Sequence, residues 1–115
     1  MDNFTFPREE RLRSKAAIKH VFSKGVKITC RGAALFIVPN GLEYNRFLCT
    51  FKRGFGTAVE RNNARRISKE AYRKIKPQLK TGKDFVLLVF SSKDGYFERF
   101  NQLVYLFTKA EMYKM

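Results

Sequence analysis

The sequence predicts a mixed α/β fold of the α+β type, a compact sandwich with its elements in the order α-β-β-β-α-β-α. Apolar residues repeat with helical spacing in three segments, near the start, in the middle and at the end of the chain. Short runs rich in β-branched and aromatic residues lie between these segments. The chain has 115 residues, of which 44% are hydrophobic and 15% aromatic. We therefore expect one domain over residues 1–115, with a single core.

The first helix is expected to begin after Ser14, which can cap it, and to end at Gly25. Ile18, Val21 and Phe22 lie at spacing i, i+3 and i+4, so they share one face of this helix. A helix with such a stripe is amphipathic and packs with its apolar face inward.

Three strands are expected next, at residues 26–29, 33–38 and 46–51. A Pro-Asn-Gly sequence opens the loop between the second and the third strand. In the second strand both alternating sets of side chains are apolar. Each face of the sheet must therefore be partly covered.

The middle helix begins with a capping box at residues 57–60, Thr-Ala-Val-Glu. It can run to about residue 75 or 76, because Pro77 cannot continue it. The sequence DFVLLVF at residues 84–90 then reads as a buried strand. A last helix is expected to carry one apolar stripe. This stripe contains Phe97, Phe100, Val104 and Phe107.

The middle helix is unusually basic. The chain has 24 Lys and Arg against 10 Asp and Glu, a net charge of +14, which implies a polyanionic partner. A helical wheel places Ala64, Ile67, Ala71 and Ile75 opposite one polar arc. The arc contains Arg61, Asn62, Arg65, Arg66, Lys69 and Arg73.

This arc predicts phosphate binding. Exposed helices usually pair an acidic side chain with a basic one four residues away. Here four cations follow one another at that spacing, namely Arg61, Arg65, Lys69 and Arg73. Each like-charged pair destabilises the helix by roughly 0.2–0.5 kcal/mol. Guanidinium groups bind phosphate oxygens through two hydrogen bonds, and Asn62 can donate to a phosphate or a base edge. Lys52 and Arg53 extend the arc, and Gly54 and Gly56 should let backbone N–H groups approach an anion.

The nucleic acid could be DNA or RNA. A helix that reads the DNA major groove usually comes with a helix-turn-helix partner or zinc ligands, and the sequence has neither pattern. Mixed α/β domains with aromatic side chains near basic ones are more typical of RNA binding. We therefore favour RNA.

Other residues that could carry chemistry favour structural roles. Cys30 and Cys49 lack metal-ligand spacing and are expected to be buried free thiols. His20 is expected on the surface rather than in a catalytic site. A metal-dependent nuclease needs clustered carboxylates, and the aspartates lie at the N-terminus or at element ends. They are Asp2, Asp84 and Asp94.

No targeting or membrane segment is expected. The first ten residues lack the apolar core of a signal peptide. The longest apolar runs have six residues, whereas a membrane helix needs about 20. These features predict a cytoplasmic protein.

With these motifs, the sequence resembles the protein subunit of bacterial ribonuclease P from residue 11 to about residue 113. Residues 11–25 contain Arg-Leu and, further on, Val-Phe-x-x-Gly. Residues 56–66 contain G-x-AV-x-RN-x-x-RR. The aromatic Phe36 and the sequence KDFVLLV before an aromatic-rich helix complete the resemblance.

Three positions depart from the family's pattern. Ile18 replaces a usual Phe, and Asn63 replaces the second Arg of the Arg-Asn-Arg hallmark. Before the helix, this chain has Lys-Arg-Gly at residues 52–54, where the family usually has Ser-Lys-Lys. Asn63 lies off the basic arc, so we expect its lost charge to weaken RNA binding less than a change at Arg65 would.

The resemblance implies a four-stranded, mostly antiparallel sheet with a left-handed β-α-β crossover that contains the basic helix. It also implies that a separate RNA subunit holds the Mg²⁺ ions and cleaves precursor tRNA, and that no protein partner is required. The protein would bind this RNA through Arg53, Arg61, Asn62, Arg65, Arg66 and Lys69. The 5′ leader of precursor tRNA would lie in a cleft between the first helix and the sheet, against Ile18, Phe22 and Phe36, with Lys19 as our addition.

Two other readings remain open from the sequence. The same basic helix would serve a non-catalytic binder of ribosomal or messenger RNA. A nuclease that acts without an RNA subunit is disfavoured by the dispersed carboxylates. Arg8, Arg11 and Arg13 could add phosphate contacts in either case.

Overall fold

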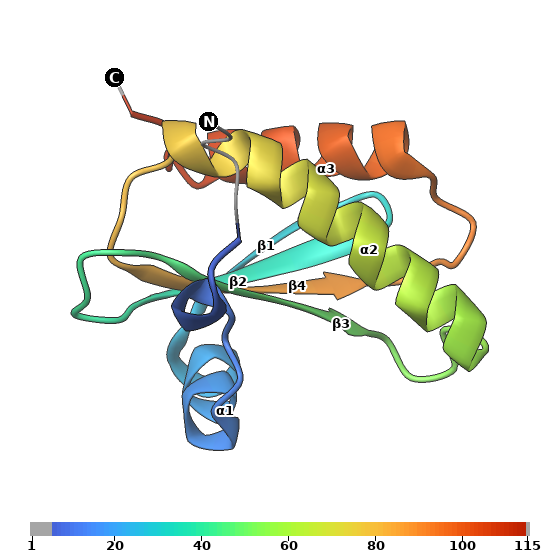
Figure 1. The fold of residues 1–115 in the computed structure, drawn as a ribbon, viewed down its shortest axis with the longest axis horizontal. Coiled ribbons are helices and arrows are strands. Elements are labelled where there is room, and N and C mark those ends of the chain that lie inside the picture. Colours follow the sequence, from blue (N-terminus) through green and yellow to red (C-terminus); the bar gives the residue numbers. More distant parts are fainter. Residues whose placement is uncertain (1–5, 115) are drawn as a thin grey trace.

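The computed structural model describes residues 6–114, in which one four-stranded sheet carries helices on both faces (Figure 1). The predicted order of the seven main elements is confirmed. No helix in this part of the chain is long and apolar enough to cross a membrane. The elements are α1 (Lys15–Lys24), β1 (Val26–Cys30), β2 (Ala33–Pro39), β3 (Arg46–Phe51), α2 (Ala58–Ile75), β4 (Lys83–Val89) and α3 (Tyr96–Lys109), with short 3₁₀ turns η1 (Arg8–Glu10) and η2 (Lys76–Gln78).

The strands lie in the order β1-β2-β4-β3. The pairs β1/β2 and β2/β4 are antiparallel, and β3/β4 is parallel. The prediction of a mostly antiparallel four-stranded sheet is therefore confirmed. Helix α2 connects the two parallel strands, and the left-handed sense of this crossover stays a prediction.

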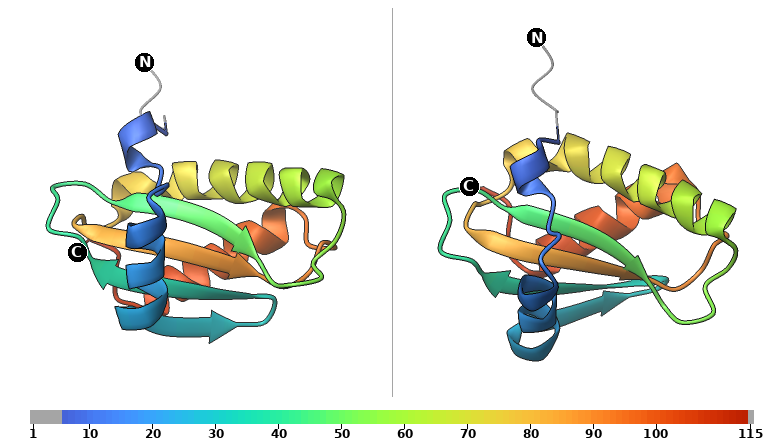
Figure 2. Two further views of the ribbon diagram at one scale, coloured as in Figure 1. Left: turned by 90° about the horizontal axis from the view of Figure 1, so that it is seen from below. Right: turned by 60° about the horizontal axis from the view of Figure 1, so that its bottom comes forward.

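Two apolar clusters lie on opposite faces of the sheet. Helix α1 packs against β2 and β4 on one face, while α2 and α3 cover the other. Figure 2 shows α1 lying across the strands in front of the sheet and α3 behind it. Both faces of β2 are consequently buried, since six of its seven residues are buried, as its continuous apolar sequence predicts.

The boundaries of α1 follow from its caps. Ser14 Oγ accepts a hydrogen bond from the Ala17 backbone N–H at 3.3 Å, as expected of an N-cap. At the other end, a Cβ on Gly25 would lie only 2.4 Å from the carbonyl oxygen of Val21. Glycine is therefore required where the chain leaves α1 for β1.

The predicted stripe of α3 is wrong at its first position, because Phe97 is 77% exposed. Phe107 is buried as predicted, and Phe100 and Val104 are half-buried against the same core. The first turn of α3 leaves Phe97 on the outer surface, and Arg99, Leu103 and Leu106 complete the buried face, which packs against β1, β2 and α2.

Both cysteines are free, as predicted, but only Cys49 is buried. Cys30 is half-buried because it ends the edge strand β1. Burial raises the pKa of both thiols.

The segment before α1 is held along the outer edge of β3. The Leu12 backbone N–H donates to the Phe47 carbonyl oxygen at 3.0 Å, so that Arg11 and Phe47 form a parallel bridge. The ring of Phe6 packs edge-on against Phe47 and Tyr72, with centroids 6.3 and 5.7 Å apart. This segment therefore lies beside α2.

Candidate nucleic-acid interface

The N-terminus of α2 has the predicted capping box. Thr57 Oγ1 accepts from the Glu60 backbone N–H at 3.1 Å, and Glu60 Oε1 accepts from the Thr57 backbone N–H at 2.8 Å. The hydrogen bond from the Thr57 backbone lowers the pKa of Glu60. A Cβ at Gly56 would lie 2.3 Å from Glu60 Oε1, so this glycine makes room for the chain's own carboxylate. The expectation that Gly56 opens the helix end to an external anion is wrong.

The opposite sides of α2 differ as predicted. Ala64, Ile67, Ala71 and Ile75 are buried. Ser68 and Tyr72 are buried as well, which widens the contact with the sheet. On the outer side Asn62, Arg65, Arg66 and Lys69 are exposed, and Arg61 is half-buried.

Within residues 6–114, these cations have no acidic partner. Arg61 Nη1 donates to the Gly56 carbonyl oxygen at 2.7 Å. Arg65 Nη1 donates to Asn62 Oδ1 at 2.9 Å. Such neutral acceptors leave the positive charge uncompensated, so the guanidinium groups remain available to phosphate.

The predicted arc is divided between two flanks of α2. Arg65 and Lys69 lie toward β3 and the N-terminal segment. Arg66 lies toward α3, where Arg66 Nη2 donates to Asn63 Oδ1 at 2.7 Å. Arg73 is half-buried and pairs with Glu70 at 3.0 Å, so its place in the exposed arc is not confirmed.

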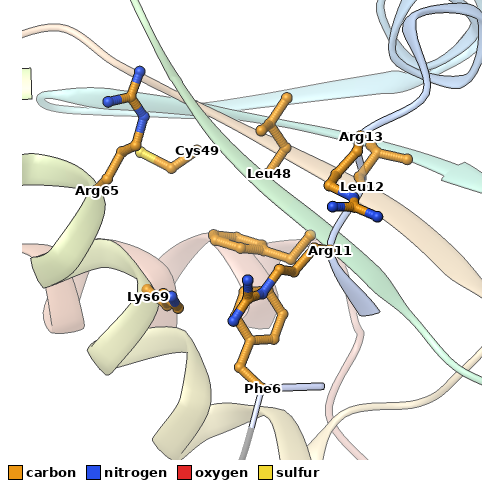
Figure 3. A pocket seen from close by; sticks show the side chains of 9 residues that line it. Phe6, Arg11, Leu12, Arg13, Leu48, Cys49, Arg65 and Lys69 are labelled. Carbon is orange, nitrogen blue, oxygen red and sulfur yellow. The ribbon is translucent and has the colours of Figure 1, made fainter. Parts of the chain in front are cut away.

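A hollow of about 200 Å³ lies where α2, β3 and the N-terminal segment meet (Figure 3). Figure 3 shows Arg65 and Lys69 on α2, Arg11 and Arg13 across from them, and Leu48 and Cys49 on β3. The lining residues are Phe6, Arg11, Leu12, Arg13, Phe47, Leu48, Cys49, Arg65 and Lys69. The structure thus joins the arginines before α1 to the basic helix, which lie some 50 positions apart in the sequence.

Lys52 and Arg53 are exposed between β3 and α2. Lys52 Nζ lies 5.7 Å from the ring centroid of Phe90, near enough for a cation–π contact. Arg53 is exposed in the loop that precedes the N-terminus of α2. This is the position in which we expected it to extend the basic surface.

The residues predicted to hold an RNA leader lie together at α1 and β2 but differ in exposure. Phe22 is 41% exposed, whereas Phe36 is 9% exposed, and their ring centroids are 4.8 Å apart in a T-shaped contact. Ile18 is half-buried against the α1 side of the sheet, and Lys19 is exposed. Phe22 is therefore the main aromatic surface of this group.

Sequence reasoning missed several residues of this region. Lys27 faces Phe36 across the strands, with its Nζ 5.6 Å from the ring centroid. Leu48, Leu88 and Phe90 extend the half-buried apolar surface on the α1 side of the sheet. The alternation of side chains along β3 and β4 could have assigned the last three to this face.

A buried polar network fixes α2 to α3. Arg99 is 1% exposed, and its Nη1 donates to Ser68 Oγ at 2.5 Å. Arg99 Nε donates to Gln102 Oε1 at 2.9 Å, and the Cys49 thiol donates to Ser68 Oγ at 3.4 Å. Burial lowers the pKa of Arg99. These contacts hold the basic helix in place beneath its exposed surface.

His20 is exposed on α1, as predicted. Asp84 is buried and Asp94 is half-buried, while Asp2 lies outside the described residues. Across residues 6–114, no three His, Cys, Asp or Glu side chains come close enough to hold a metal ion. The exposed side chains on α2 include Arg65, Arg66 and Lys69, whose charged groups are able to bind phosphate.

Comparison with known proteins gives the family. The family model described as Ribonuclease P matches residues 6–111. The chain is 40% identical over 88 residues to the "Ribonuclease P protein component" of Petrotoga mobilis, covering 76% of this chain and 75% of the relative. It is 32% identical over 95 residues to the protein of that name from Thermotoga petrophila, covering 83% and 81%.

Solved structures agree with this assignment. The ribonuclease P protein from Thermotoga maritima superposes with a TM-score of 0.78 at 25% identity, covering 87% of this chain and 96% of that one. The Staphylococcus aureus protein superposes with a TM-score of 0.82 at 18% identity, covering 91% and 98%, and supports the fold. Taken with the basic helix and its sequence pattern, these matches establish that the chain belongs to the ribonuclease P protein family.

Proposed function

We propose that this protein is the RNA-binding subunit of a ribonuclease P ribonucleoprotein that removes the 5′ leader of precursor tRNA. The observation that carries the proposal is the exposed row of cations on α2, which lack acidic partners in the described part of the chain. A rigid helix that presents uncompensated guanidinium groups is suited to the RNA backbone. The membership of the family adds the ribonucleoprotein context.

Two separate surfaces of the protein bind the two RNAs. The catalytic RNA contacts the basic surface, chiefly through its phosphates, and Asn62 donates to a phosphate or a base edge. The single-stranded leader lies against α1 and β2, where the exposed ring of Phe22 offers a stacking surface and Lys19 offers a charge. The basic surface consists of Arg53, Arg61, Asn62, Arg65, Arg66 and Lys69, and the leader surface of Ile18, Lys19, Phe22 and Phe36.

The chemistry belongs to the RNA subunit in this proposal. The Mg²⁺ ions are held mainly by that RNA, as the resemblance to the family implies. Ribonuclease P RNA and precursor tRNA are the partners, with no further protein required. The work takes place in the cytoplasm, in one RNA-binding domain.

Reconstitution tests this function. The protein is added to a ribonuclease P RNA at a Mg²⁺ concentration too low for the RNA alone, and cleavage of precursor tRNA is followed. We expect cleavage to recover with protein and to be absent with protein alone. A preparation that cleaves precursor tRNA without the RNA subunit would overturn the division of labour.

The basic surface is tested by comparing two variants of α2. Arg65→Ala removes an exposed guanidinium, so its affinity for ribonuclease P RNA should fall, and the slope of log K against log salt should drop by about one. Asn63→Arg restores the family's residue on the flank that faces α3 and should change affinity less. A larger change at position 63 would contradict the assignment of the β3-facing flank.

A binder of ribosomal or messenger RNA is the second candidate. One solved relative is described as a Staphylococcus aureus ribonuclease P protein "mutant with defective mRNA degradation activity", a phrase that concerns that protein. For this chain, tight binding to ribosomal or messenger RNA without any recovery of precursor tRNA cleavage would favour the second candidate.

A further inference from the structure

The hollow beside β3 combines an apolar floor with a cationic rim. Its floor contains the rings of Phe6 and Phe47 and the side chains of Leu12, Leu48 and Cys49. The rim has four cations and no acid among its lining residues. These cations are Arg11, Arg13, Arg65 and Lys69.

The cations come from separate parts of the chain and line this hollow (Figure 3), with the Arg65 guanidinium over the ring of Phe51, 4.8 Å from its centroid. Two of them lie over the same ring, with Arg11 Cζ 5.7 Å and Lys69 Nζ 5.9 Å from the centroid of Phe6. Like charges gathered in a concave site focus a positive potential there. The preferred occupant of the rim is therefore an anionic group.

The apolar floor of the hollow is suited to a planar ring rather than to an anion. A cavity of about 150 Å³ lined by apolar side chains is large enough to hold a benzene molecule, so a hollow of about 200 Å³ can admit one planar ring. Aromatic side chains favour such a ring through offset or edge contacts. Strand β3 is the edge of the sheet, and the N-terminal segment pairs with it at Phe47. Outward backbone groups of an edge strand beyond such a bridge can donate to or accept from a polar ring edge.

We propose that this hollow binds one unpaired nucleotide of an RNA, with the base against the floor and the phosphate at the rim. The inference rests on the proposed function, because it assumes an RNA partner, and it adds a nucleotide site on the outer edge of β3. This site is centred on the other side of β3 from Phe22 and Phe36, which belong to α1 and β2, and Leu48 borders both surfaces. A nucleotide satisfies floor and rim together, whereas free phosphate or a neutral ring satisfies only one of them.

Binding is tested with the full chain and a mononucleotide as the probe. The ¹⁵N-labelled protein is titrated with adenosine 5′-monophosphate, with adenosine and with inorganic phosphate, and amide shifts are followed by NMR. We expect the mononucleotide to shift the amides of Phe6, Leu12, Leu48 and Cys49 and to bind at least about tenfold more tightly than either fragment.

Two variants separate the rim from the floor. Lys69→Gln removes one rim charge from an exposed position and should lower the affinity for the mononucleotide about tenfold. Lys109→Gln removes an equal charge from α3 and serves as the control. It should change this affinity less than about twofold. Phe6→Leu keeps an apolar side chain in the floor but removes the aromatic ring. It should weaken binding of the mononucleotide and leave binding of inorganic phosphate unchanged. The amide spectrum of each variant shows whether it is folded.

Three results would overturn the inference: shifts confined to α1 and β2, inorganic phosphate binding as tightly as the mononucleotide, or equal losses in Lys69→Gln and Lys109→Gln. The cleavage assay of the wild-type protein keeps this test apart from the proposed function. If cleavage recovers but the β3 amides do not shift, the nucleotide site is wrong and the function stands. If the amides shift but cleavage never recovers, the site stands and the proposed function is wrong.

Discussion

Asp84 holds one end of the sheet together through two distant partners. Its Oδ1 accepts from Arg46 Nε at 2.8 Å and from Asn40 Nδ2 at 2.9 Å, and its Oδ2 accepts from Arg46 Nη2 at 2.7 Å. The side chain of Asp84 is 4% exposed. In the sequence Asp84 is only an aspartate before an apolar run, and its partners are 38 and 44 positions away. Local patterns cannot predict a contact at that separation, and the same holds for Arg99 with Ser68.

Replacing Asp84 with alanine should destabilise the fold by about 3 kcal/mol. The change leaves the Arg46 guanidinium and the Asn40 amide without their buried acceptor. Unfolding in urea, followed by circular dichroism, measures the loss. Glu9→Ala removes the same charge from an exposed turn and serves as the control. If both variants lost the same stability, net charge rather than the buried contact would be responsible.

At the scale of the element, α2 shows how far periodicity reaches. The positions of its buried stripe follow from helical spacing alone, and Ala64, Ile67, Ala71 and Ile75 are buried as predicted. The division of the cations into two flanks could not be predicted, because a helical wheel does not show which other elements pack beside the helix. It is the N-terminal segment and β3 on one side, and α3 on the other, that separate Arg65 from Arg66.

Ala71→Leu should cost about 1–3 kcal/mol, because Ala71 is fully buried and the added atoms have no space. Helix propensity is nearly unchanged, since alanine and leucine are both strong helix formers. Ala58→Leu, at the exposed first position of α2, should cost much less. Urea midpoints compare the two. Equal midpoints would mean that α2 does not lie as close to the sheet as its two buried alanines indicate.

At the scale of the whole molecule, a charge of +14 on 115 residues opposes the compact state. An anion that binds only the folded chain stabilises it, by about 1.4 kcal/mol at ten times its Kd. We expect sulfate to raise the unfolding midpoint by about 4 °C or more over chloride at equal ionic strength.

Circular dichroism melts with the two salts measure this shift. The double variant Arg65→Gln, Lys69→Gln separates bound sulfate from the general effect of sulfate on protein stability, because it should lose part of the increment. A wild-type midpoint that is the same in both salts would refute the prediction.

The sequence predicts the class and order of the elements because each depends on local spacing, caps and turns. The position of β4 depends on pairing between distant segments. Local patterns define β4 as a buried strand, and its two apolar faces require neighbours on both sides. Which strands those neighbours are is decided by the path of α2, and the same path brings Arg11 and Phe6 beside Lys69.

The place of β4 between β2 and β3 also constrains how the chain is made. Strands β1 and β2 can form a hairpin early, but β3 has no partner in the sheet until residues 83–89 have left the ribosome. A nascent chain that stops before this point exposes the apolar side chains of β3 and cannot close its core. The two halves of the sheet can therefore join only after β4 has been made, and slow translation of residues 83–89 prolongs the exposure of β3.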